Sequence, residues 1–259
     1  MLNYANLQMA AEALYSFNTR KTDPAALLPG DPISPQGHDS GAILTNWLTD
    51  GNEHASRFTL TEAEKFVAQW KVVDHISNTT TGFSGTLFQN KETNEYVLSF
   101  RSTEFIDDAA RDAVATNGME IKEYGWAFGQ IGDMEAWYAK LQQSGLLPAD
   151  AHYSVTGYSL SGHLATAFNL LRREDGTLGQ IDQVVTFNGA GVGQVQGTLS
   201  SVMNDFTALR NAPDSIATRF SDARLATLYA TLRQRLADGH TPGSEDYALL
   251  NTVTADSMA

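Results

Sequence analysis

The chain contains Ser154-Val-Thr-Gly157-Tyr158-Ser159-Leu160-Ser161-Gly162-His163-Leu-Ala-Thr-Ala-Phe168, the stretch that decides its fold. An apolar strand leads into a turn of small residues, and the chain leaves this turn directly as a helix. A strand over His152–Thr156, a helix over Gly162–Arg172 and a strand over Val184–Phe187 together form a β-α-β unit. Such a unit requires a parallel sheet, so the predicted fold class is α/β.

Further elements are predicted on both sides of this unit. A helix is expected over residues 3–17. A second begins at the capping-box pattern of Thr61 and Glu64 and ends near Trp70, and a third covers residues 126–144. Turn-forming segments separate three strand-like runs, which predicts antiparallel hairpins: Lys71–Ser77, Phe83–Gln89 and Glu95–Arg101.

Two regions of the chain have a different texture. Residues 18–58 contain four prolines with several glycines and aspartates, and this composition predicts a long surface excursion. Residues 195–259 are poor in aromatic side chains and helical in period throughout. We therefore divide the chain into a core, residues 1–193, and a helical segment, residues 194–259, which is an extension, an insertion or the opening part of one.

Composition excludes several classes of function. The chain has 259 residues, a formal charge of −13 and no cysteine, and its isoelectric point is about 4.7. The acidic excess argues against nucleic acid or an anionic membrane surface as the main partner. The absence of cysteine excludes disulfides, thiolate metal sites and a cysteine nucleophile. The first ten residues lack the basic and apolar regions of a signal peptide, and no run of about 18 apolar residues is present.

The strand–turn–helix context gives Ser159 a chemical interpretation. In this context a G-x-S-x-G motif indicates a nucleophile elbow, in which a strained serine exposes its hydroxyl above the sheet. Gly157 fits the first small position, whereas Ser161 replaces glycine at the second and Gly162 follows it. Ser161 is the poorer candidate for the nucleophile. If it were the serine of the motif, glycines would be expected at positions 159 and 163, where the chain has Ser159 and His163. The alternatives are a glycine- and serine-rich helix start without chemistry, or a turn that cradles phosphate.

An oxyanion hole is predicted from two segments. In α/β-hydrolases one donor is the amide after the nucleophile, here that of Leu160, and the other comes from the loop after an earlier strand. The strand predicted over Glu95–Arg101 is followed by Ser102 and Thr103. Thr103 is therefore the candidate for the second donor, with its amide and its hydroxyl. An ordinary strand ending in a turn is the alternative.

These motifs resemble those of class 3 lipases, the fungal-type family of α/β-hydrolases. The family's F-R-G-T/S strand is similar to Phe100–Thr103, with Ser102 in place of glycine. Its T-G-H-S-L-G-G elbow is similar to Thr156–Gly162, and its V-x-T-F-G strand to residues 185–189. The resemblance spans about residues 70–193. It implies an α/β-hydrolase fold with a mostly parallel sheet, a counterpart of the family's aspartate at Asp112, and a lid over residues 104–125.

The acid and the base of a triad are not evident in the sequence. His163 lies one helical turn after Ser159, where a packing or capping role is expected. His38, His54, His75 and His152 precede the serine, whereas in α/β-hydrolases the histidine follows it. His240 has the required order but lies in a loop between predicted helices, and Asp214 and Asp222 precede it without ending a convincing strand. We expect the acid and the base on chain beyond residue 259.

The sequence thus predicts a serine-dependent carboxylic ester hydrolase, similar to a lipase or phospholipase A1, that acts on lipid esters at a lipid–water interface. Ser159 is the predicted nucleophile, Thr103 and Leu160 supply the oxyanion hole, and no metal or organic cofactor is required. A catalytically incomplete binding or packing module, or a peptidase or thioesterase, is the alternative. An acidic, cysteine-free, lipase-like chain without an N-terminal signal resembles the bacterial lipases that are exported by a C-terminal signal. This resemblance predicts secretion, and a cytoplasmic location is the alternative.

Overall fold

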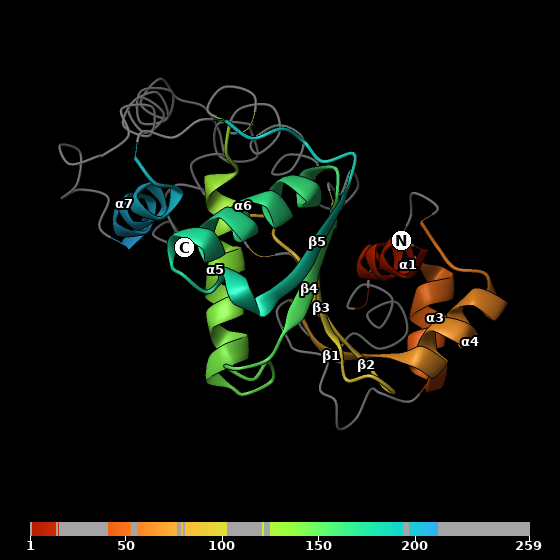
Figure 1. Cartoon of the computed structure of the whole chain (residues 1–259). Helices are drawn as coiled ribbons and strands as arrows, with labels where there is room; N and C mark the ends of the chain where they lie inside the picture. The colour runs from red at the N-terminus through yellow and green to blue at the C-terminus, as the bar shows by residue number, and fades with distance from the viewer. Residues whose placement is uncertain are drawn as a thin grey trace, which may run out of the picture.

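The computed structural model of the chain describes residues 2–13, 15, 41–52, 56–76, 79, 81–102, 121, 125–193 and 197–211. Within these ranges five strands form one mixed sheet, in the order β1-β2-β3-β4-β5 (Figure 1). Their bounds are Trp70–Ile76, Gly85–Asn90, Tyr96–Phe100, Tyr153–Tyr158 and Ile181–Phe187.

The pairing of the strands agrees with the sequence. β1, β2 and β3 pair antiparallel as successive hairpins. β3 and β4 pair parallel, and so do β4 and β5. The predicted hairpins and the predicted β-α-β unit are both confirmed, and the fold is a mixed α/β fold whose sheet is parallel in its later half.

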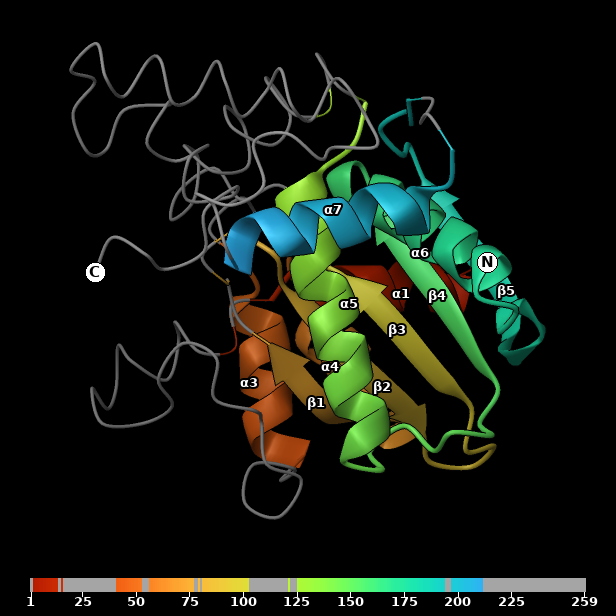
Figure 2. The same cartoon turned by 90° about the vertical axis from the view of Figure 1, so that its left-hand side faces the viewer.

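Helices cover the two faces of the sheet (Figures 1 and 2). One face carries α1, α3 and α4, which span Leu2–Ala11, Gly41–Asp50 and Leu60–Gln69. The other carries α5, α6 and α7, which span Phe128–Gln143, Leu160–Glu174 and Leu199–Asn211; a short 3-10 helix, η2, spans Leu178–Gln180. Among the described helices none is long and apolar enough to cross a membrane.

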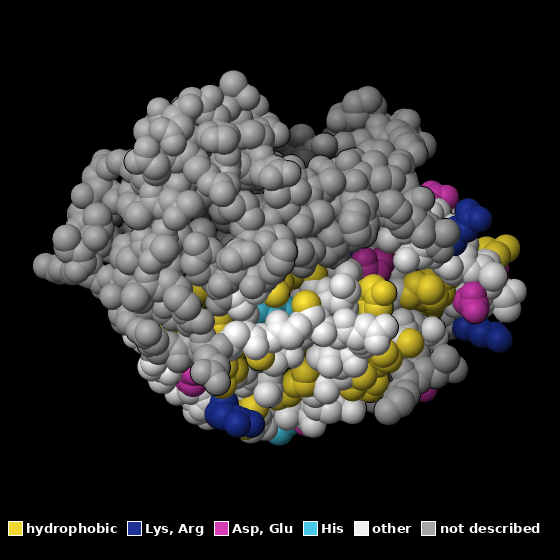
Figure 3. All heavy atoms as spheres, turned by 90° about the horizontal axis from the view of Figure 1, so that it is seen from above, with side chains coloured by type: hydrophobic (Ala, Val, Ile, Leu, Met, Phe, Trp, Pro, Cys, Tyr) yellow, Lys and Arg dark blue, Asp and Glu magenta, His cyan; other side chains and the backbone are white. Residues whose placement is uncertain are grey.

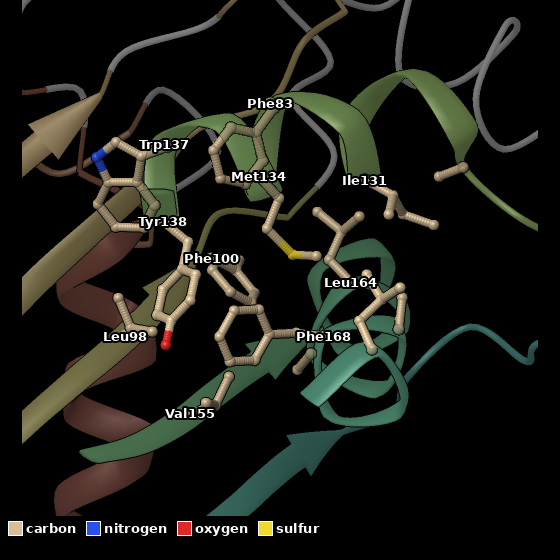
Figure 4. Close-up of a cluster of buried hydrophobic side chains, with 14 of the residues drawn as sticks. Phe83, Leu98, Phe100, Ile131, Met134, Trp137, Tyr138, Val155, Leu164 and Phe168 are labelled. Atoms are coloured by element: carbon tan, nitrogen blue, oxygen red, sulfur yellow. The ribbon is translucent and has the colours of Figure 1, made fainter. Parts of the chain in front are cut away.

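Aromatic side chains fill the core between the sheet and α5 and α6 (Figure 4). Phe168 of α6 lies with its ring centroid 6.0 Å from that of Phe100 at the end of β3 and 5.0 Å from that of Tyr138 of α5. Burial of each such side chain contributes about 1.5–3 kcal/mol. This packing holds β3, α5 and α6 together beneath the segment that carries Ser159.

On the opposite face, α3 corrects the prediction for residues 18–58. Residues 41–50 form a helix whose Leu44, Trp47 and Leu48 are buried in a second core with α1 and α4. These three residues stand at positions i, i+3 and i+4, so they form one apolar stripe. The prediction of a surface excursion is therefore wrong for this helix. The stripe is short, and the prolines and glycines nearby in the sequence favoured a loop instead.

The start of α4 corrects the predicted capping box. The cap is Thr59, not Thr61: its hydroxyl accepts from the Glu62 amide at 3.4 Å, and Glu62 Oε2 accepts from the Thr59 amide at 2.9 Å. Both registers contain Thr-x-x-Glu, and burial decides between them. Phe58, before the cap, is buried against Phe66, so the chain must turn into the helix directly after it.

The helical prediction after residue 193 holds for α7. Leu199, Val202 and Met203 are buried in the core formed with α5 and α6. Glu174, at the end of α6, accepts the Leu199 and Ser200 amides at 3.0 and 2.7 Å and thereby caps the helix. The rest of the predicted extension, residues 212–259, lies outside the described residues.

Candidate active site

Ser159 has a strained backbone at the junction of β4 and α6. Its φ is 54° and its ψ is −117°, a conformation that a residue with a Cβ rarely adopts. The Ser159 amide donates to the Phe187 carbonyl at 2.9 Å, and the Ser159 carbonyl accepts from the Gly162 and Ala190 amides at 3.0 and 2.9 Å. A serine held in this way by its neighbours is typical of functional sites, because the surrounding structure must offset the strain.

Two glycines permit the sharp turn. A Cβ on Gly157 would lie 2.7 Å from the Gly162 nitrogen and also against the Ser161 carbonyl. A Cβ on Gly162 would lie 2.7 Å from Gly189 Cα, in the loop after β5. The close approach therefore falls at Gly162 rather than at residue 161, which explains why a serine is accommodated at the second small position of the motif.

The two serines of the turn differ in their hydrogen bonding. Ser161 is fully buried: its hydroxyl donates to the Tyr158 carbonyl at 2.8 Å and accepts from the Tyr158 amide at 2.7 Å and from Gln8 Nε2 at 3.3 Å. One donor and two acceptor positions exhaust a hydroxyl. Ser159 is half-buried and its side chain caps no amide of α6. No hydrogen bond to its hydroxyl is present among the described residues, so of the two hydroxyls this is the one free to react.

The start of α6 places amides beside Ser159. The Gly162 and His163 amides donate to the Ser159 carbonyl, whereas the Leu160 amide has no acceptor within the helix. The positive end of a 15-residue helix thus lies at the serine, and it favours negative charge there. This is the arrangement that the predicted role of Leu160 requires.

The end of β3 lies at the same edge of the sheet as Ser159. β3 and β4 are parallel neighbours, with Ser99 opposite Thr156, so residues 101 and 102 leave the sheet beside the elbow. Thr103, Asp112 and the predicted lid, apart from residues 121 and 125, lie outside the described residues.

A pair of polar residues, Gln8 on α1 and Glu12 directly after it, links these two segments, and sequence reasoning missed it. Glu12 Oε1 accepts from the Ser102 amide at 2.9 Å and from Gln8 Nε2 at 2.8 Å. Gln8 Nε2 also donates to the Phe100 carbonyl at 2.9 Å and to Ser161 Oγ at 3.3 Å. Two buried polar residues one turn apart in an apolar helix were the available signal. We call Gln8 and Glu12 the α1 brace.

His163 has a structural role, as predicted from its position. It is fully buried, and its Nε2 accepts from the Ala127 amide at 3.1 Å. Nδ1 therefore carries the proton and donates to the Gly191 carbonyl at 2.9 Å. Burial lowers the pKa of His163, against the hydrogen bond to Gly191. Both ring nitrogens tie loops beside the elbow to α6, so neither is available as a base for Ser159.

The other described histidines also lie away from Ser159. His152 precedes β4, at the opposite end of that six-residue strand, about 20 Å away at 3.3 Å per residue. His75 is buried in β1, three strands from β4, which is roughly 14 Å. His38, His54, His240, Asp214 and Asp222 lie outside the described residues.

No family model, curated protein or solved structure matches this chain. The function must therefore be argued from the site itself. Among the described residues no group of three or more His, Cys, Asp or Glu side chains could hold a metal ion.

Apolar side chains lie beside the elbow. Tyr158, directly before Ser159, is 44% exposed, and Val192, in the loop after β5, is 46% exposed. That loop is anchored where the Gly193 amide donates to the Gly125 carbonyl at 2.8 Å. Seen from above, the middle of the described surface carries mostly hydrophobic and neutral polar atoms, with a histidine and an acidic side chain among them (Figure 3). Lys and Arg side chains lie toward its two ends. This surface favours an uncharged, partly apolar ligand.

Proposed function

We propose that the protein is a serine hydrolase that cleaves carboxylic esters of lipids, with Ser159 as its nucleophile. The observation that carries the proposal is the conformation of Ser159, with φ at 54° and ψ at −117° between β4 and α6 and with a hydroxyl that has no partner among the described residues. The strain at Ser159 lowers the stability of the fold, and no hydrogen bond of its hydroxyl within the described residues offsets it, in contrast to Ser161. Such strain is typical of functional sites.

The proposed reaction begins with attack of Ser159 Oγ on the ester carbonyl carbon, while the hydroxyl proton passes to a histidine base. The three described histidines lack either the free nitrogen or the position for this role, so the base is another histidine, oriented by an acidic residue. The carbonyl oxygen becomes an oxyanion, which the Leu160 amide and the helix dipole stabilise, together with a donor from Thr103. Removal of one such donor costs about 2.7–4 kcal/mol in a comparable hydrolase.

Collapse of the tetrahedral intermediate breaks the ester C–O bond, and the protonated histidine gives its proton to the leaving alcohol. The acyl group is then bound to Ser159 Oγ. Water attacks this acyl-enzyme with the same histidine as base, which releases the carboxylic acid and restores the serine.

A second candidate is a binding module that keeps the fold without the chemistry. Among the described residues no histidine lies where it can take the Ser159 proton, and this observation favours the second candidate. A peptidase or thioesterase would use the same elbow and differs only in the substrate.

A fluorophosphonate probe tests the proposal. We expect a covalent adduct on Ser159, identified by mass spectrometry, in the full-length wild-type protein and in its Ser161→Ala variant, and none in its Ser159→Ala variant. Loss of labelling in both variants, with folding intact, would contradict the assignment of the nucleophile. A folded wild-type chain that takes no probe would favour the binding module. Nitrophenyl ester, thioester and peptide substrates then separate the classes of hydrolase.

A further inference from the structure

A hollow of about 370 Å³ lies between α1 and the ends of β4 and β5. Ala5, Gln8 and Met9 line it from α1, together with Glu12 directly after that helix. Tyr158 and Phe187 line it from the strands, and Ser56, before α4, completes the described lining. Ala5, Gln8, Met9 and Glu12 stand at i, i+3, i+4 and i+7, and the Glu12 amide donates to the Gln8 carbonyl at 3.2 Å. The four residues therefore form one continuous face, although α1 itself ends at Ala11. The hollow lies on the side of the sheet opposite to α6.

The hollow adjoins the proposed nucleophile. Tyr158 is the chain neighbour of Ser159, and the Phe187 carbonyl accepts the Ser159 amide at 2.9 Å. Gln8 contacts Ser161, two residues after Ser159, at 3.3 Å. Three of the lining residues are therefore fixed to the elbow by a covalent or hydrogen bond.

The chemistry of the wall is apolar. Ala5, Met9 and Phe187 contribute hydrocarbon, sulfur and an aromatic ring, and Tyr158 exposes 44% of its surface beside them. The polar ends of Gln8 and Glu12 are engaged with the Phe100 carbonyl and the Ser102 amide. The described lining is therefore mostly apolar, with the Ser56 hydroxyl at one side, and an apolar ligand gains from leaving water.

We propose that this hollow binds a single acyl chain of medium length, that of the ester whose carbonyl carbon Ser159 attacks. Small-molecule sites span roughly 300–1,000 Å³, and this hollow lies at the lower end, which suits one chain rather than two. The assignment to an ester rests on the proposed function. The occupancy by an alkyl chain rests only on the hollow and its lining.

Binding of free fatty acids tests the hollow without requiring turnover. Calorimetric titration of the full chain with butanoate, hexanoate and octanoate is expected to show about fourfold tighter binding for each added methylene, until the hollow is full. Met9→Trp fills the hollow and is expected to weaken octanoate binding at least tenfold. Leu60→Trp, at an exposed apolar residue of α4, is the matched control and is expected to bind octanoate as the wild type does.

A second variant guards against misfolding of the first. Ala5→Phe narrows the same hollow from the preceding turn of α1, and circular dichroism establishes that each variant is folded. Binding that does not depend on chain length, or that both folded variants leave unchanged, would overturn the proposal.

Labelling of Ser159 with ethyl and octyl fluorophosphonates separates the two proposals. Faster labelling by the octyl probe, lost in Met9→Trp but kept in Leu60→Trp, supports the hollow as the acyl site of the ester. Labelling of Ser159 without any chain-length preference would contradict the assignment of the hollow as the acyl site, and it would still support the proposed hydrolase. Chain-length-dependent binding of fatty acids without any labelling of Ser159 would contradict the proposed hydrolase and its ester substrate. It would still support the hollow as a site that binds an alkyl chain.

Discussion

Replacing Ser159 by glycine is expected to stabilise the protein while it removes the proposed nucleophile. The backbone at φ 54° and ψ −117° carries strain of about 1–3 kcal/mol for a residue with a Cβ. Glycine relieves it, at a cost of about 0.5–1 kcal/mol for the greater freedom of the unfolded chain. The hydroxyl has no hydrogen-bond partner among the described residues, so its removal costs little. The net expectation for Ser159→Gly is a gain of about 1 kcal/mol.

Two variants serve as matched controls. Ser159→Ala loses the same hydroxyl but keeps the Cβ and the strain, so its stability is expected within about 0.5 kcal/mol of the wild type. Ser161→Gly makes the same substitution two residues later. It removes the acceptor of the partly buried Tyr158 amide and is expected to cost about 1 kcal/mol or more.

Urea denaturation measures all three variants, with the slope of the transition checked for constancy. The expected order of stability is Ser159→Gly, then wild type and Ser159→Ala together, then Ser161→Gly. If Ser159→Gly is no more stable than Ser159→Ala, the strain is absent, and the principal argument for a reactive serine at this position fails.

Two further predictions concern the surroundings of the serine, and a third concerns His75 in β1. Glu12→Ala is expected to speed hydrogen exchange at the Ser102 amide, which loses its acceptor, and to lower kcat with little change in KM. Glu12→Gln keeps an acceptor oxygen and should restore both the exchange rate and kcat. Unchanged exchange in Glu12→Ala would rule out the α1 brace. Thr103→Val, which removes only the hydroxyl, is expected to lower kcat with no comparable loss of stability, and an unchanged kcat would mean that the hydroxyl takes no part. Burial, with a smaller contribution from the charge of Arg101, lowers the pKa of His75 to about 3. The unfolded chain therefore binds this proton below about pH 6.5 and the folded chain does not, so this residue is expected to cost about 1.4 kcal/mol of stability per pH unit between those values. Urea midpoints from pH 7 to 4 measure the loss, which should shrink in His75→Asn; an equally steep loss in that variant would assign it to other groups.

The elements around the elbow could be predicted because their signals are local. The β-α-β unit requires only an apolar strand, small residues at the turn and a helical period, all within residues 152–187. The strained serine also follows from local chemistry, because only Gly157 allows the chain to double back against the backbone of residues 161 and 162.

The boundaries near α3 and α4 were not predictable in the same way. Thr59 and Thr61 offer the same capping pattern, and the choice depends on the burial of Phe58 against Phe66. The apolar stripe of α3 becomes a helix because a core formed with α1 and α4 covers it. Both outcomes depend on contacts with other elements, which local propensity does not contain.

By itself the sequence determined the sheet's later half and the sharp turn at Ser159 between β4 and α6, since each depends on residues a few positions apart. Only the tertiary structure decided what surrounds the serine. Gln8 reaches Ser161 across 153 positions, Glu12 reaches Ser102 across 90, and His163 reaches Gly191 across 28. Such contacts form because packing α1 and α6 on opposite faces of the sheet brings their polar groups to one edge, where each buried donor must find an acceptor.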